Sequence, residues 1–151
     1  MKRGNTTFQK MSGVTLLEIL LVLAISATFL ISSIRYYESA VYSLQANNAL
    51  EQAQSITAAI DNFIAGTSSY LAVSTSTLNS FMPPHSLTTP WGTEMIIDAA
   101  EMNSYTVTFP NTPAKICPLI SSKLANNKHY QISSTCGDSA TDFTYIYLAN
   151  A

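Results

Sequence analysis

Glu18 is the residue whose type and position point most directly to a specific role. It is the one charged residue in an apolar stretch of 18 residues, VTLLEILLVLAISATFLI, at positions 14–31. A carboxylate in such a stretch is costly in lipid and is tolerated where a partner compensates its charge. We therefore expect Glu18 to have a function, and that function requires a partner.

Cys117 and Cys136 are the two cysteines of the chain. An even pair outside a membrane anchor fits an exported protein in an oxidising compartment. A bridge would close a loop of about 20 residues and stabilise the fold by roughly 3 kcal/mol in the chain-entropy model. The alternative is two unrelated buried thiols.

The other residues with catalytic or metal-binding chemistry form no recognisable site. His85 and His129 are far apart in the sequence and have no ligand pattern around them, so we interpret both as loop residues. Asp138 and Asp142 could be calcium ligands, but their spacing matches no calcium loop, and the alternative is two solvated acids. The chain also lacks the G-x-S-x-G, P-loop, H-E-x-x-H and C-x-x-C motifs. The sequence thus predicts no enzyme, no metal site and no cofactor.

The apolar stretch at 14–31 has the properties of a membrane span. As a helix it would extend about 27 Å, just enough to cross a bilayer core. Lys2, Arg3 and Lys10 precede it and should hold its N-terminal side in the cytoplasm, so that the rest of the chain is translocated. Two alternatives are a secretory signal cut near residues 24–26 and a plain anchor. Neither explains Glu18.

Charge is unevenly distributed along the chain. The net charge is −2, but without residues 1–13 four basic side chains would remain against nine acidic ones. The sequence contains no basic stripe, so nucleic acid is a poor candidate partner.

Residues 10–18, KMSGVTLLE, resemble the processing site of type IV prepilins and pseudopilins. In that family a membrane aspartic peptidase cuts after the glycine and methylates the new N-terminal amine, and a glutamate stands fifth in the mature chain. Gly13, Val14 and Glu18 match these positions. The resemblance implies that residues 1–13 are a cytoplasmic leader that is cleaved off.

The resemblance also supplies a partner for Glu18. Cleavage would leave a cationic amine at Val14, and Glu18 of a neighbouring helix would compensate it in lipid. Glu18 would then be an assembly residue. Many family members have Phe or Met at the position of Val14, and the leader is short for the type IVb-like group, so the subclass stays open.

Residues 14–65 are expected to form one long helix, because no proline occurs before Phe81 and no glycine between Val14 and Ala65. The half at 14–34 would be the membrane and assembly segment, and Gly66 would cap the end. Beyond that half, apolar residues recur mostly at spacings of three and four, as in an amphipathic helix: Ile34, Tyr37, Val41, Leu44, Ala49, Ala53, Ile56, Ile60 and Phe63.

Residues 66–151 are expected to form a small head. We interpret Thr67–Ser80 as a loop or short irregular segment. Residues 90–92, PWG, are expected to form a turn in which Trp91 covers the core edge and Gly92 permits a tight bend. A short helix is expected around residues 116–124. Four strands are expected: Glu94–Asp98, Ser104–Phe109, Tyr130–Ser134 and a central Phe143–Leu148. The predicted fold class is α+β: a long N-terminal helix packed on a small antiparallel sheet, as in pilins.

Three functions remain open on the sequence alone. The first is a major or minor structural subunit of a type IV pilus, and the second is a pseudopilin of a type II secretion system. The third, a membrane-anchored periplasmic binding module, does not account for the processing motif. A bridge between Cys117 and Cys136 resembles the C-terminal disulfide loop of type IV pilins and favours the first.

The resemblance implies the partners and the location as well. The partners would be copies of the chain, other pilins, a prepilin peptidase, an assembly platform and a secretin. The precursor would lie in the inner membrane, and the mature chain in an extracellular pilus or a periplasmic pseudopilus.

Overall fold

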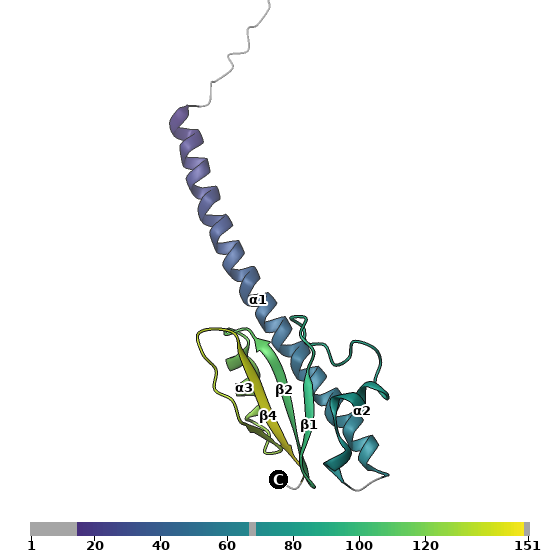
Figure 1. The fold of residues 1–151 in the computed structure, drawn as a ribbon. Coiled ribbons are helices and arrows are strands. Elements are labelled where there is room, and N and C mark those ends of the chain that lie inside the picture. Colours follow the sequence, from purple (N-terminus) through teal and green to yellow (C-terminus); the bar gives the residue numbers. More distant parts are fainter. Residues whose placement is uncertain (1–14, 67–68, 150–151) are drawn as a thin grey trace, which may run out of the picture. The chain divides into compact units, whose positions relative to one another are not determined.

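The computed structural model describes residues 15–66 and 69–149, so Gly13 and Val14 lie outside the described residues. The chain divides into two compact units, Met1–Glu38 and Ser39–Ala151, and helix α1 (Leu16–Ile64) contributes residues to both (Figure 1). The second unit adds a four-stranded antiparallel sheet. The fold is α+β, as predicted.

The sheet has the order β1-β2-β4-β3, with antiparallel pairing throughout. The four predicted strands are all present with shifted ends: β1 (Ile96–Glu101), β2 (Ser104–Thr112), β3 (Tyr130–Ile132) and β4 (Thr141–Leu148). β4 lies between β2 and β3, which confirms its prediction as a central strand. On β2, Tyr105, Val107 and Phe109 are buried and alternate with half-exposed threonines, because successive side chains point to opposite faces.

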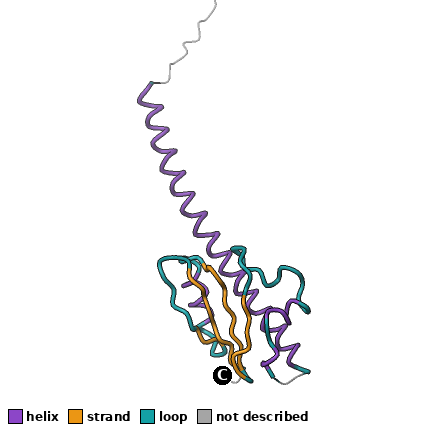
Figure 2. The backbone as a smooth tube through the Cα atoms, viewed as in Figure 1, coloured by secondary structure: helices purple, strands orange, loops and turns teal. Residues whose placement is uncertain are grey.

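The second half of α1 packs against this sheet and forms the core with it (Figure 2). Its buried residues follow a strict three–four spacing: Ala46, Ala49, Ala53, Ile56 and Ile60. The first three are alanines and the last two are isoleucines. The predicted amphipathic pattern is confirmed from Ala49 onward, whereas Leu44 is exposed.

The prediction of a loop at Thr67–Ser80 is wrong for most of its described part. A short 3-10 helix, η1 (Tyr70–Ala72), and a short helix, α2 (Thr75–Asn79), occupy it. Ser69 and Ser74 cap them by accepting hydrogen bonds from backbone N–H groups of Leu71 and Thr77.

Two glycine predictions have different outcomes. Gly92 has a φ of 90°, so the turn at residues 90–92 does use a conformation that suits glycine. Gly66 does not adopt the left-handed conformation, so α1 ends without the glycine cap that the sequence predicted. Trp91 is partly buried against the core, as expected, and its indole Nε1–H donates to the Pro110 carbonyl at 2.8 Å.

Candidate assembly surfaces

Glu18 lies in the first turn of α1. The helix begins at Leu16, and the Thr15 hydroxyl accepts a hydrogen bond from the Glu18 backbone N–H at 3.3 Å. Thr15-Leu16-Leu17-Glu18 has the spacing of a helix N-cap with an acid at the third position, and a carboxylate there is favoured by the helix dipole. This cap was not among the features predicted from the sequence, although the T-x-x-E pattern signals it. The carboxylate is therefore placed at the helix end that the predicted cut would free.

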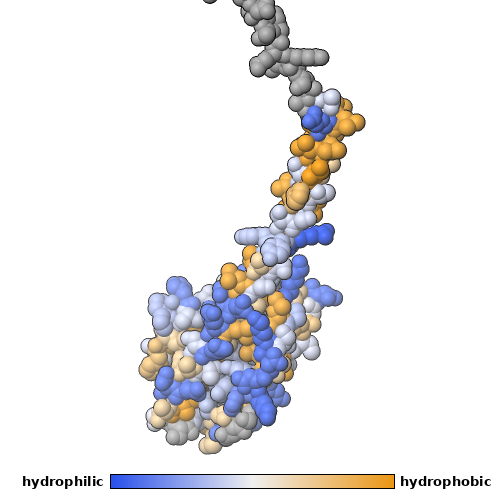
Figure 3. All heavy atoms as spheres, turned by 180° about the vertical axis from the view of Figure 1, so that it is seen from behind, coloured by the Kyte–Doolittle hydropathy of each residue, from blue (hydrophilic) through white to orange (hydrophobic). Residues whose placement is uncertain are grey.

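The first half of α1 exposes an apolar surface. From Leu16 to Ile34 its large aliphatic and aromatic side chains are between 49% and 78% exposed. Figure 3 shows this apolar surface. An 18-residue window of the helix has a mean hydropathy of 2.3, and the helix is long and apolar enough to cross a membrane by length and composition. Such a surface requires lipid or protein to cover it.

The few hydroxyl groups in this half are satisfied within the helix. Ser26 donates to the Val22 carbonyl at 2.7 Å and Ser32 donates to the Thr28 carbonyl at 2.9 Å. Thr28 and Ser33 form equivalent bonds to carbonyls three and four residues earlier. These polar groups therefore need no water, which suits a helix in lipid or among other apolar helices.

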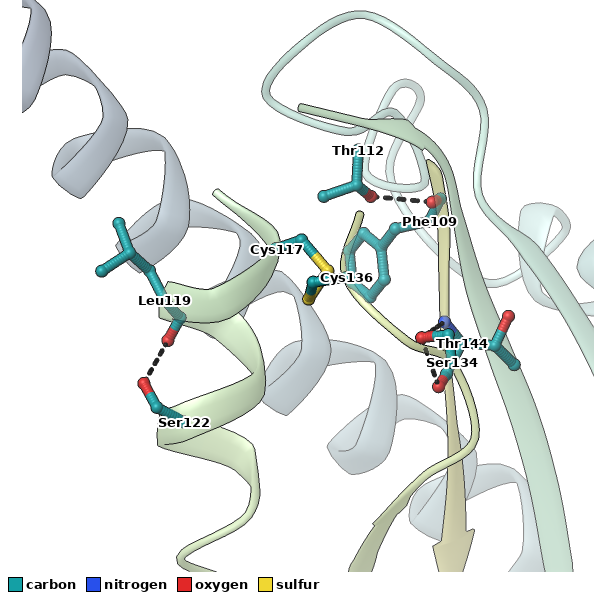
Figure 4. The surroundings of a disulfide bond; sticks show 8 residues. All are labelled: Phe109, Thr112, Cys117, Leu119, Ser122, Ser134, Cys136 and Thr144. Carbon is teal, nitrogen blue, oxygen red and sulfur yellow. Dashed lines mark hydrogen bonds between the residues drawn. A yellow bond between two sulfur atoms is a disulfide. The ribbon is translucent and has the colours of Figure 1, made fainter. Parts of the chain in front are cut away.

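The predicted bridge between Cys117 and Cys136 is present (Figure 4). It joins the first residue of α3 (Cys117–Leu124) to the loop between β3 and β4, with 5.7 Å between the two Cα atoms. Cys117 is fully buried and Cys136 is exposed. Ser134 holds the same loop to β4, because its hydroxyl accepts a hydrogen bond from the Thr144 backbone N–H at 2.9 Å. The bridge therefore fixes a loop that has no regular structure of its own.

A hydroxyl network links α1 to the sheet inside the core. The Tyr105 hydroxyl donates to Thr57 Oγ1 at 2.9 Å, and Thr57 in turn donates to the Ala53 carbonyl at 3.0 Å. Burial raises the pKa of the Tyr105 phenol, and burial raises that of Tyr145 well above its ordinary value. The Tyr145 hydroxyl is buried without a hydrogen-bond partner among the described residues. The bond between Tyr105 and Thr57 therefore joins β2 to α1 within the core.

The histidines and the loop acid Asp142, which were considered as possible ligands from the sequence, contact other parts of the protein and not one another. His85 has a φ of 66° and lines a polar hollow of about 250 Å³ together with Glu94. His129 Nδ1 lies 2.8 Å from the Leu148 carbonyl, and the Asp142 carboxylate accepts a hydrogen bond from the Asn111 backbone N–H. Within residues 15–66 and 69–149, no three His, Cys, Asp or Glu side chains gather where they could hold a metal ion.

Comparison with known proteins agrees with the resemblance. The chain is 32% identical over 109 residues to the major structural subunit of bundle-forming pilus from Escherichia coli O127:H6 (strain E2348/69 / EPEC), and equally to that of Escherichia coli O111:H-. The match covers 66% of this chain and 55% of each relative, so the chain spans about half the length of the curated relatives it matches. No protein-family model matches.

The chain is thus similar to structural subunits of a pilus, which agrees with its resemblance to type IV pilins. Its relatives are structural subunits and not enzymes, in agreement with the expectation from the sequence. The structure of this pilin-like protein thus describes an exposed apolar half of α1 with Glu18 in its first turn and, in the second unit, a disulfide-bound loop.

Proposed function

We propose that this pilin-like protein is a major or minor structural subunit of a type IV pilus. It is made as an inner-membrane precursor, cut between Gly13 and Val14 by a prepilin peptidase, and polymerised through the first half of α1. An assembly platform and a secretin act on it as in the family. The observation that carries the proposal is the exposed apolar surface of α1 from Leu16 to Ile34.

That surface suits two successive environments. Lipid covers it in the precursor, and the same helices of neighbouring copies cover it in the fibre. Transfer from one to the other costs little, because the helix exchanges one apolar surrounding for another. The internally bonded hydroxyls of Ser26 and Ser32 support both states.

Glu18 is the polar group that distinguishes the two environments. It lies in the first turn of α1, where the Thr15 hydroxyl accepts a hydrogen bond from its backbone N–H. After cleavage, the Val14 amine of a neighbouring copy would pair with this carboxylate. The pairing compensates two charges that are each costly in lipid, and it sets the axial offset between copies.

Glu18→Ala tests this role. The variant should insert and be cleaved like the wild type, because the apolar stretch becomes more apolar and the cut lies four peptide bonds upstream. It should accumulate as mature chain in the inner membrane, with little in sheared surface fibres. Glu38→Ala is the matched control, since Glu38 is an exposed acid of the same helix beyond the apolar stretch, and it should assemble normally.

The measurements are fractionation into membrane and sheared fibres and mass spectrometry of the mature N-terminus, each with and without a prepilin peptidase. Normal fibre yield from Glu18→Ala would refute the assembly role. A mature chain that begins at Ala27 would indicate an ordinary signal peptide and refute the pilin role. Normal processing without surface fibres from the wild type would favour a type II secretion pseudopilin.

A further inference from the structure

Acidic and basic side chains of the second unit come from different stretches of the chain. Positions 39–114 contain five Asp or Glu residues and no Lys or Arg. The three lysines of this unit are Lys115, Lys123 and Lys128, and they all fall within 14 positions. Two acids, Asp138 and Asp142, follow them. The charge is therefore divided along the sequence.

The sheet order places the two groups at opposite edges. β1 forms one edge and carries Asp98 and Glu101, and Glu94 lies two residues before it. α3 contacts β3 at the other edge, and Figure 1 shows α3 and β1 on opposite sides of the sheet. We call Glu94, Asp98 and Glu101 the acidic flank and the three lysines the lysine flank; all six side chains are exposed.

Each flank also exposes an apolar residue among its charges. Ile96 is 49% exposed and shares one face of β1 with Asp98, because side chains alternate along a strand, and Glu94 lies two residues before Ile96. Leu119 is 36% exposed and is four residues from both Lys115 and Lys123. An apolar centre with charges around it is the usual composition of a protein interface.

Two of the lysines contact neighbouring groups that leave their charge uncompensated. Lys115 Nζ lies 5.1 Å from the centre of the Tyr42 ring, and Lys123 Nζ donates to Asn47 Oδ1. Among the described residues, none of the six flank side chains forms an ion pair. Both flanks therefore keep their charge available for a partner outside the unit.

We propose that the lysine flank of one copy docks against the acidic flank of the next copy in the fibre. The two flanks are complementary in charge, and each offers one exposed aliphatic side chain. Because they differ and lie at opposite edges of one sheet, each copy can bind a neighbour at both flanks, and such head-to-tail contacts build an open filament when the rotation between copies does not close a ring. This inference rests on the proposed function, since it names the contact between second units in the same fibre.

Zero-length crosslinking tests the contact directly. Treating sheared wild-type fibres with a carbodiimide joins a lysine amine to a carboxylate that it touches. We expect a ladder of covalent multimers and, after proteolysis, linked peptides that join a lysine of residues 115–128 to an acid of residues 94–101. Within one copy these flanks lie at opposite edges, so such a link has to join two copies. A ladder whose links all fall elsewhere would overturn the proposal.

Charge reversal gives a second test with a matched control. Asp98→Lys should lower the fibre yield about fivefold or more, because every junction loses an attraction and gains a repulsion. Asp138→Lys makes the same change in net charge beside the lysine flank and should not lower it. Lys123→Glu should also lower the yield. A chain that carries both reversals should recover the fibre yield. Coexpression of the two single variants should also recover it, because copies of the two variants can alternate along the fibre.

The possible results of these tests distinguish failure of the docking contact from failure of the proposed function. Trp91 fluorescence and the Cys117–Cys136 linkage of membrane-extracted chain would confirm that each variant is folded. Equal losses from Asp98→Lys and Asp138→Lys, or no loss from either, would overturn the docking while leaving the pilus assignment intact if the wild type forms fibres. Absence of fibres from correctly processed wild type would refute the proposed function and the docking together.

Discussion

Loss of the Cys117–Cys136 bond should destabilise the second unit by about 3 kcal/mol. The two residues are 19 positions apart. In the chain-entropy model, a bond that closes a loop of this size lowers the conformational entropy of the unfolded chain and so stabilises the folded state by about 3 kcal/mol. The structure gives little other support to the loop, because β3 has three residues and positions 133–140 form no helix or strand. Ser133 and Ser134 provide further local contact through their hydrogen bonds to Thr144.

Urea unfolding of the detergent-solubilised mature chain measures this effect. Trp91 is the one tryptophan, and it packs against the core with its ring centre 6.1 Å from that of Phe109, so its fluorescence reports on this unit. With an m-value of about 1–3 kcal/mol per M, reduction should lower the midpoint by about 1–3 M. Both the reduced wild type and the Cys117→Ala, Cys136→Ala double variant should show it.

Comparing these two forms separates the crosslink from side-chain packing. The reduced wild type keeps the buried Cys117 side chain, whereas the double variant also removes its sulfur atom. The double variant should therefore be slightly less stable than the reduced wild type. An oxidised and a reduced protein with the same midpoint would refute the argument, because the loop would then be fixed by other contacts.

Two further predictions concern the buried tyrosines and use the same assay. Tyr105→Phe should lower the free energy of unfolding by about 1 kcal/mol, because it removes the hydrogen bond to Thr57. Tyr145→Phe removes a hydroxyl without a partner and should leave the free energy of unfolding unchanged or raise it by about 1 kcal/mol. Equal losses from the two variants would contradict this reasoning. Burial raises the pKa of both phenols, so the folded chain retains protons that the unfolded chain releases above pH ~10. Stability should thus be complete below pH ~10 and fall above it by about 1.4 kcal/mol per pH unit for each buried tyrosine, and Tyr145→Phe should make this slope shallower.

The sequence was sufficient to predict the strands because each has a clear local pattern. Tyr105, Val107 and Phe109 alternate with threonines, and β4 is aromatic and β-branched along most of its length. The ends of β1 were harder to predict. The first expected strand began at Glu94, but that residue forms an isolated bridge with Thr88, and β1 continues instead to Glu101. Pairing with β2 decides these ends, and pairing is not visible in one strand.

The prediction for residues 69–80 was wrong for a different physical reason. Its serines and threonines suggested a loop, because they compete for backbone hydrogen bonds. The same property makes Ser69 and Ser74 good helix caps, and each begins a short helix. The flanks could not be predicted from the sequence either. Lysines at 115–128 and acids at 94–101 are merely two charged stretches until the order β1-β2-β4-β3 separates them.

The edges of the sheet are largely unavailable for adding a strand from another copy. Along β1, the Ala99 N–H donates to the Val73 carbonyl at 3.1 Å and the Ile97 N–H donates to Thr75 Oγ1 at 2.7 Å. The other edge strand, β3, has only three residues, and α3 contacts it. Short and covered edges prevent uncontrolled strand pairing.

Contacts between copies therefore have to come from side chains, and the two surfaces available differ in kind. Burial of the apolar half of α1 between copies would be strong but non-directional, so it would hold copies together without fixing their rotation or offset. Charge pairs add little energy when exposed, but they reject wrong arrangements, because like charges then meet. Helix burial would thus supply the energy of the fibre, while Glu18 and the two flanks would select one arrangement of its subunits.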